Sequence, residues 1–385
     1  MKKDISDRVA DMPPFHVMEV LERAQELERE GRKVIHLEIG EPDLPTAPHI
    51  CEAAAAAMCS GNTKYTHSQG IPELREAIAE RYMEKFGVMV APEQVMITSG
   101  TSPAMLSLFL ALVDPGDEVI MSNPHYACYP NFVRAVNGIP DFIYTDGESG
   151  FMLQPRQVAG RINERTRALL INSPSNPTGQ VMPPEIMQGL AEVAGDVPII
   201  SDEIYQGLVY EGEDHTILEF TDNAFVLNGF SKLYAMTGWR LGYLIAPDRY
   251  IRTLQKIQQN FFISTNAFVQ YAGVAALKGP QEVVKQMVTA YDQRRRYMLG
   301  RLRRMGLEIE SEPKGAYYIL ADARRFSEDS LRLSQRILED IGVAVTPGID
   351  FGDGAEGFLR FSYANSLDSI KEGMDRLEAY LKSIR

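Results

Sequence analysis

The chain has 385 residues, of which 45% are hydrophobic and 24% are charged, as in globular proteins rather than disordered or fibrous ones. Its formal net charge of −13 and the lack of any run rich in Lys and Arg argue against a nucleic-acid-binding protein. The longest strongly apolar stretch, AMLSLFLALV, is far shorter than the ~20 residues that span a bilayer, so we expect no membrane partner.

The first segment, MKKDISDRVADMPP, carries basic residues but no apolar core, so it does not resemble a signal peptide. The three cysteines, Cys51, Cys59 and Cys128, form no CxxC motif, and we expect free, buried thiols. The six histidines are scattered without metal-ligand spacing, so no metal site is expected. Together these features predict a cytoplasmic protein.

Residues 47–280 alternate short apolar runs with helical patterns. A strand in EQVMITSG leads into a helix in TSPAMLSLFLALVDPG, and further strands are predicted in DEVIMSNP, DFIYTD, RALLINSP, DVPIISDEIY, AFVLNGFSK and RLGYLIAP. Near-continuous Val, Ile and Leu runs separated by helices are typical of a parallel sheet buried on both faces. We therefore predict an α/β fold in which residues 47–280 form a large domain with a mostly parallel sheet flanked by helices.

The pattern changes at about Pro280. A long, charged amphipathic helix precedes predicted strands in LEIESEPKGAYYILAD, GVAVTPG and GFLRFSYA, and a final helix follows. We predict that residues 1–46 and 281–385 form a smaller α+β domain. Within it, GDGAEG spells G-x-G-x-x-G, but a strand follows instead of the helix that a dinucleotide fold requires, so we interpret it as a loop before Arg360.

Polar residues stand at the carboxyl ends of the predicted strands, where parallel sheets bind their ligands. Residues 99–102 open a helix and are either a phosphate site or a plain cap. Asn176 lies in SPSNPTG, which taken alone favours a simple turn. Asp202 ends a strand buried on both faces, where a carboxylate is costly unless it caps a helix or meets a partner. Lys232 follows AFVLNGFS in surroundings that offer little exposed face.

Three motifs, NPTG, DEIY and SKLYAMTGWRLGY, occur in this order and closely resemble those of fold-type I pyridoxal-phosphate (PLP) enzymes, specifically class I/II aminotransferases of the aspartate aminotransferase superfamily. The resemblance extends from GEPD to LRFSYA. It implies that the large domain binds pyridoxal 5′-phosphate. It also implies ping-pong transfer of an amino group between an amino acid and a 2-oxo acid.

The resemblance also implies individual roles. Lys232 would form a Schiff base with PLP and act as general acid and base, while Asp202 would keep the ring nitrogen protonated. Catalysis is thus assigned to Lys232, Asp202 and Tyr205. The residues implied to bind the cofactor are Gly100, Thr101, Ser102, Tyr126, Asn176, Asp202, Tyr205, Lys232, Arg240 and Tyr65. Those implied to bind the substrate are Gly40, Asn176 and Arg360, with Arg360 on the α-carboxylate.

Tyr65, in KYTHSQGIPELREAI, matches a family tyrosine that reaches the phosphate of the neighbouring subunit, which implies a homodimer with shared active sites. On pattern alone, Tyr65 is a surface residue near a turn, and Arg360 is a solvent-facing strand residue. The position three before the lysine, a hydroxyl residue in many relatives, is Gly229 here, which implies one fewer phosphate contact.

Several alternatives stay open. A β-lyase or a decarboxylase on the same scaffold would share the cofactor-binding residues. A PLP-sensing regulator would need an added DNA-binding domain, and the aminotransferase resemblance begins too early to leave room for one. No motif identifies an arginine for an acidic substrate side chain, whereas Phe15, His16 and Tyr126 suggest that aromatic or large apolar side chains fit.

Overall fold

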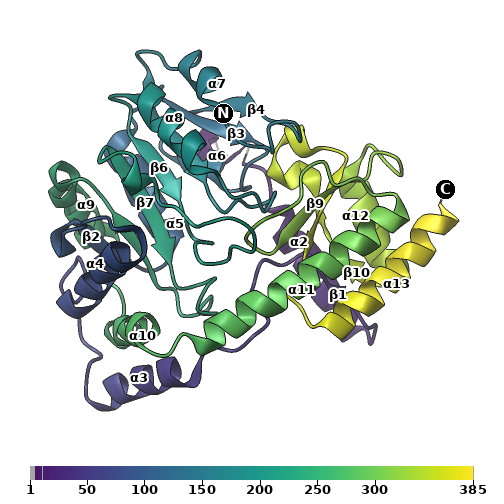
Figure 1. Cartoon of the computed structure of the whole chain (residues 1–385), viewed down its shortest axis with the longest axis horizontal. Coiled ribbons are helices and arrows are strands. Elements are labelled where there is room, and N and C mark those ends of the chain that lie inside the picture. The colour runs from purple at the N-terminus through teal and green to yellow at the C-terminus, as the bar shows by residue number, and fades with distance from the viewer. Residues whose placement is uncertain (1–4, 11, 385) are drawn as a thin grey trace.

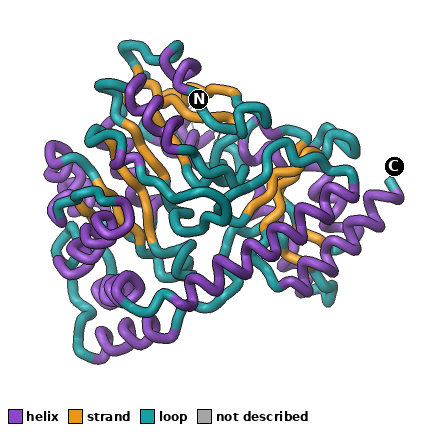
Figure 2. Tube along the Cα trace, viewed as in Figure 1, coloured by secondary structure: helices purple, strands orange, loops and turns teal. Residues whose placement is uncertain are grey.

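The computed structural model describes residues 5–10 and 12–384. A seven-stranded sheet lies on one side of the molecule, and two smaller sheets lie on the other (Figures 1 and 2). The order of the large sheet is β2-β8-β7-β6-β5-β3-β4. Its strands are β2 (Val95–Thr98), β3 (Glu118–Asn123), β4 (Ile139–Tyr144), β5 (Thr166–Asn172), β6 (Ile199–Asp202), β7 (Ala224–Gly229) and β8 (Gly242–Ile245).

Most of this sheet is parallel. β4, β3, β5, β6 and β7 pair in parallel, whereas β8 pairs antiparallel with both β7 and β2. Successive residues of a strand enter opposite hydrophobic cores, as Ile199 and Ile200 do in β6. The predicted α/β fold with a mostly parallel sheet is therefore confirmed. The antiparallel β8 was not foreseen, and it follows β7 through a segment without a helix, so the chain turns back beside β7.

Helices cover this sheet and extend below it in Figure 1. They are α3 (Pro48–Cys59), α4 (Pro72–Phe86), α5 (Thr101–Leu112), α6 (Tyr129–Ala135), α7 (Pro155–Ala159), α8 (Pro184–Ala194), α9 (Asp248–Phe261) and α10 (Ala267–Lys278). The prediction that the cysteines are buried is wrong. Cys51 and Cys59 are exposed, and Cys128 is only partly buried. On α3, helical periodicity turns Ile50 and Ala54 toward the interior instead.

The second group of elements is built around β9 (Tyr318–Asp322), β11 (Thr346–Pro347) and β12 (Phe358–Ser362), with β12 in the centre. β1 (Ile35–His36) pairs in parallel with β10 (Val343–Ala344). The helices of this group are α2 (His16–Arg29), α11 (Glu282–Met305), α12 (Ser330–Ile341) and α13 (Leu367–Ser383). The short helix α1 (Asp7–Ala10) contacts α6 instead.

The long helix α11 runs from the vicinity of α10 to the smaller sheets in Figure 1 and so spans both groups of elements. We propose that residues 1–46 and 281–385 form the small domain around these sheets, and residues 47–280 the large one. The GDGAEG segment forms a short 3-10 turn, Asp353–Ala355, and then enters strand β12, which confirms its interpretation as a loop.

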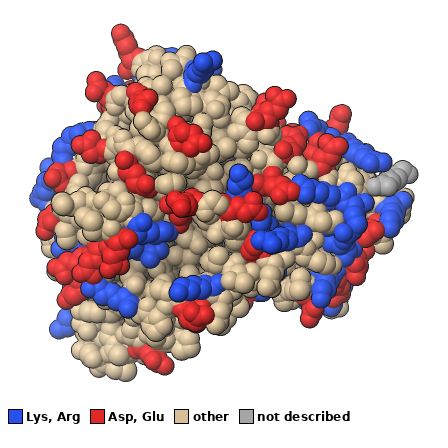
Figure 3. Space-filling view, in the orientation of Figure 1, with Lys and Arg blue, Asp and Glu red and all other residues tan. Residues whose placement is uncertain are grey.

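Within the described part of the chain, no helix combines the length and apolar character needed to cross a membrane. Those same residues contain no group of three or more His, Cys, Asp or Glu side chains that could hold a metal ion. On the face shown in Figure 3, the basic side chains lie among acidic ones. This face therefore offers no continuous basic field of the kind that attracts nucleic acid.

Candidate active site

Most residues singled out in the sequence converge on one pocket of about 300 Å³, at the carboxyl ends of β2, β5, β6 and β7. The predicted residues that line it are Gly40, Thr101, Ser102, Tyr126, Asn176, Asp202, Tyr205, Lys232, Arg240 and Arg360. Gly100 directly precedes this lining. Tyr65 is 81% exposed and is not among the described residues that line the pocket of its own chain.

One end of the pocket is the start of helix α5. Gly100 precedes the helix with φ 97°, a conformation that favours glycine, and no side chain caps the first turn. A Cβ at Gly100 would lie 2.6 Å from Nη2 of Arg240, so the missing side chain also lets the guanidinium approach the helix. This end of the pocket suits an anion. It offers the N–H groups and the dipole of the helix start, the hydroxyls of Thr101 and Ser102, and the positive charge of Arg240.

Asp202, at the end of β6, is buried. Its Oδ2 accepts a hydrogen bond from the hydroxyl of Tyr129 (2.8 Å), and its Oδ1 accepts one from the N–H of Ile204 (3.1 Å). Both of these donors are neutral. Burial raises the pKa of Asp202 to about 6, although the two hydrogen bonds and the charge of Lys232 act against the shift. A carboxylate held in this way would gain strongly from a cationic partner in the pocket.

Lys232 projects into the pocket after β7, and its Nζ donates to the carbonyl oxygen of Gly40 (2.6 Å). Burial lowers the pKa of Lys232 to about 8; the charge of Glu41 opposes this shift, and those of Arg360 and Arg240 add to it. The amine therefore deprotonates closer to neutral pH than an ordinary lysine, as a nucleophile or a base requires.

This lowered pKa predicts how Lys232 reacts in the ligand-free protein. Because only the neutral amine attacks acetic anhydride, brief acetylation of Lys232 should rise through a midpoint near pH 8, against ~10.4 for an unperturbed lysine. Peptide mass spectrometry at each pH measures the modified fraction. The exposed Lys64 in the same digest is an internal control. Superimposable profiles for Lys64 and Lys232 would contradict the lowered pKa.

Arg360, in β12, is 2% exposed, so the alternative that it faces solvent is wrong. Its Nη1 donates to Oδ1 of Asn176 (2.8 Å), and its Nη2 donates to Oγ1 of Thr346 (3.1 Å) and to the carbonyl of Glu38. The guanidinium also stacks on the ring of Tyr318, 4.3 Å from its centroid. These acceptors are neutral, and Nε has no partner among the described residues. A buried guanidinium with neutral acceptors is suited to a carboxylate ligand.

The residues of the site that the sequence did not point to include Tyr129, Asn172 and Tyr318. Asn172 ends β5, donates to the carbonyl of Asp202 (2.8 Å) and accepts from the N–H of Asn176 (2.8 Å). Tyr129 and Asn172 follow or end strands, so the strand-end rule could have found them. Tyr318 comes from the other sheet, and no local signal identifies it.

Tyr318, from β9, lines the pocket and contacts several of its residues. Its hydroxyl lies 2.7 Å from the hydroxyl of Tyr205, and it fills the space that a side chain at Gly40 would need, because a Cβ there would lie 1.9 Å from it. Gly40, Tyr205 and Arg360 are therefore held together by one tyrosine from β9.

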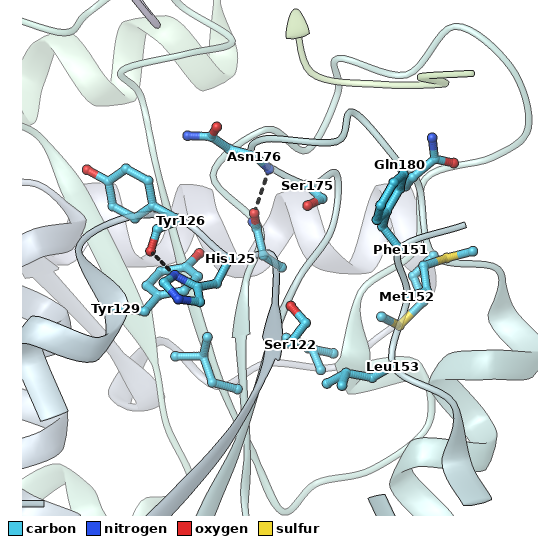
Figure 4. A pocket seen from close by; sticks show the side chains of 14 residues that line it. Ser122, His125, Tyr126, Tyr129, Phe151, Met152, Leu153, Ser175, Asn176 and Gln180 are labelled. Atoms are coloured by element: carbon cyan, nitrogen blue, oxygen red, sulfur yellow. Dashed lines mark hydrogen bonds between the residues drawn. The ribbon is translucent and has the colours of Figure 1, made fainter. Parts of the chain in front are cut away.

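A smaller cavity of about 20 Å³, the size of a single water molecule, adjoins the pocket (Figure 4). His125 and Tyr129 lie on one side of this cavity and Phe151 on the other. Nδ1–H of His125 donates to the carbonyl of Tyr126 (3.0 Å). Burial lowers the pKa of His125 to about 4, so the ring is neutral. The residues common to both cavities are Tyr126, Tyr129, Asn172 and Asn176.

Comparisons with known proteins agree with this geometry. Residues 32–377 match the family model described as aminotransferase class I and II. The chain is 42% identical to a protein named (5-formylfuran-3-yl)methyl phosphate transaminase from Methanocaldococcus jannaschii, over 98% of this chain and 99% of that protein. It is 39% identical to an aspartate/prephenate aminotransferase from Thermus thermophilus, again over 98% and 99% of the two chains.

The fold is also that of a solved aminotransferase structure. The structure of Thermus thermophilus aspartate aminotransferase with maleate superposes with a TM-score of 0.94 at 39% identity, covering 98% of this chain and 99% of the other.

Proposed function

The chain belongs to the class I and II aminotransferases and is an enzyme that acts on an amino acid and a 2-oxo acid, and from that membership we propose that it binds pyridoxal 5′-phosphate in the pocket of Lys232. The observation that carries the proposal is a set of groups in one pocket whose charges and hydrogen-bonding capacity complement those of the cofactor. Asp202 is a buried carboxylate with neutral donors only, and the uncapped start of α5 faces Arg240. PLP offers a basic ring nitrogen, an anionic phosphate and an aldehyde that an amine can attack.

The ring nitrogen would pair with Asp202, whose carboxylate is already oriented by Tyr129 and by the N–H of Ile204. Asn176 and Tyr205 would contact the ring oxygen, and Tyr126 would cover a ring face. The residues that would hold the phosphate are Gly100, Thr101, Ser102 and Arg240, and the aldehyde would meet Lys232.

When bound, PLP supplies an electron sink that makes the Cα proton of an amino acid removable. Arg360 and Asn176 would hold the α-carboxylate, and Gly40 would bring backbone close to it. Lys232, with a pKa near 8, would take the proton from Cα and return it to the cofactor side. Asp202 would keep the ring nitrogen protonated throughout.

A homodimer is part of the proposal. Tyr65 is 81% exposed and lies outside its own pocket, as expected for a side chain that serves the phosphate of a neighbouring subunit. Tyr65→Phe should therefore weaken PLP binding in the dimer although the residue is outside its own pocket.

The half-reaction tests the proposed function. With PLP bound and an amino acid supplied alone, each active site should form a single equivalent of the matching 2-oxo acid and then stop. Adding a 2-oxo acid should restart turnover. Continuous release of ammonia and pyruvate would assign a lyase instead, and release of carbon dioxide a decarboxylase.

Tyr318→Phe gives a finer prediction. The substitution removes the hydroxyl that lies 2.7 Å from that of Tyr205 but keeps the ring stacked on Arg360. When Tyr205 donates to an anionic ring oxygen, the Tyr318 hydroxyl can donate to Tyr205 in turn, so without it Tyr205 stabilises that oxygen less well. The pH midpoint of the visible absorbance change should therefore rise, and kcat should fall about fivefold, as expected for one hydrogen bond of about 1 kcal/mol. Tyr205→Phe should shift the midpoint further, whereas a wild-type midpoint in Tyr318→Phe would contradict this role.

A further inference from the structure

Resting on the proposed function, we infer that the side-chain end of the substrate pocket accepts aromatic and large aliphatic amino acids in preference to acidic ones. Once the cofactor and the α-carboxylate have been placed, the remaining wall of the pocket consists of Phe15, Val17, Met18 and Ile39, which we call the apolar wall. Tyr126, which would cover the cofactor ring, borders this wall.

The cations of the pocket already have partners in the proposed complex. Among the described residues that line it, the Lys and Arg side chains are Lys232, Arg240 and Arg360. Lys232 meets the aldehyde, Arg240 the phosphate and Arg360 the α-carboxylate. The same lining includes Glu41, whose charge would repel a second carboxylate. An acidic side chain would thus be desolvated without a counter-ion from this chain.

The apolar wall consists of side chains that favour an apolar ligand. The ring of Phe15 packs edge-on against Tyr126, with centroids 6.0 Å apart and planes at 89°. Val17 is buried and Met18 is half exposed beside them. A phenyl or branched aliphatic side chain placed here buries its own apolar surface and that of the wall. Met18 adds a flexible side chain that adjusts to ligands of different shape.

A buried carboxylate from another part of the chain holds this wall in place. Asp350 accepts hydrogen bonds from the N–H groups of His16 (Oδ1, 2.9 Å) and Val17 (Oδ2, 3.3 Å) at the start of α2. These N–H groups belong to the first turn, and Phe15 provides no side-chain cap. Asp350 thereby fixes the turn that carries Phe15, Val17 and Met18. His16, which the sequence suggested, does not line the pocket and instead contacts Glu19 (2.8 Å).

The first experiment compares amino donors with the PLP-loaded wild-type enzyme and one common 2-oxo acid. We expect kcat/KM for phenylalanine or leucine to exceed that for aspartate and glutamate by at least about tenfold, the scale of discrimination by side-chain contacts. Equal or better use of aspartate would overturn the inference and indicate a cation from outside this chain. If no amino acid yields a 2-oxo acid, the proposed function itself fails, which is a separate outcome.

Two variants locate the preference in the apolar wall. Phe15→Ala should lower kcat/KM for phenylalanine about tenfold and leave that for alanine, which does not reach the wall, within about twofold. Met18→Arg should raise kcat/KM for aspartate relative to kcat/KM for phenylalanine. Met18→Leu is its control, because leucine is close to methionine in size and carries no charge. Equal losses with every donor in Phe15→Ala, or an unchanged ratio in Met18→Arg, would contradict a specificity role.

Discussion

Replacing Lys232 with alanine should abolish transamination, with kcat reduced by about 10⁴-fold or more, because among the described residues that line the pocket Lys232 alone carries an amine. Cofactor binding should persist, since Asp202, Arg240 and the start of α5 are untouched. The measurement is kcat with the best amino donor, together with the PLP that co-elutes with the variant in gel filtration.

Lys232→Arg is the matched control, because it keeps a long side chain and a positive charge, but its guanidinium stays protonated and cannot act as a base. The two variants should be equally inactive if a titrating amine is required. Near-normal turnover in Lys232→Ala would mean that the proton is moved by another group. Activity in Lys232→Arg alone would mean that charge matters and the amine does not.

Asp202→Asn should lower kcat by about 10² to 10⁴, the equivalent of the 3–5 kcal/mol lost when one partner of a buried ion pair is removed. The amide has nearly the same shape as the carboxylate but carries no charge to keep the ring nitrogen protonated. Tyr129→Phe removes only the hydrogen bond of 2.8 Å to Asp202 and should cost much less. Activity of Asp202→Asn within tenfold of the wild type would contradict the proposed pairing.

The same substitution should have the opposite effect on the stability of the ligand-free protein. Burial raises the pKa of Asp202 to about 6, from ~3.9 in an unfolded chain, so the folded state binds a proton that the unfolded state has lost. Between these values stability falls as pH rises, and above pH 6 the whole penalty is present. Ligand-free Asp202→Asn should therefore be more stable by on the order of 2 kcal/mol at pH 7–8 in denaturant titrations. The difference should vanish near pH 4, and a difference that does not depend on pH would contradict the raised pKa.

Much of the site could be predicted because of where the chain places polar residues. Asp202, Asn176 and Lys232 each follow a near-continuous apolar run, and parallel strands bring such positions to one edge of the sheet. The order of NPTG, DEIY and SKLYAMTGWRLGY then assigned one ligand to that edge. The burial of Arg360 was harder to predict. Its alternation with Leu359 and Phe361 is typical of a half-exposed strand, whereas β12 is buried on both faces.

Long-range packing limited the rest. Tyr318 and Asp350 act on residues far away in the sequence, Tyr205 and His16, and nothing in their own neighbourhoods marks them. The antiparallel direction of β8 was not foreseen for the same reason, since the apolar run in RLGYLIAP looks alike in either orientation. The exposure of Cys51 depended on which side of α3 faces the protein, which an alanine-rich helix does not show clearly.

The central claim is that Lys232 carries the cofactor and releases it to an amino acid. Borohydride reduction of the PLP-loaded protein, followed by peptide mass spectrometry, tests it directly. We expect a single modified residue, Lys232, and we expect that an amino donor added beforehand without a 2-oxo acid prevents the modification. A cofactor fixed on another lysine, no fixation at all, or fixation on Lys232 that no amino acid prevents would contradict it.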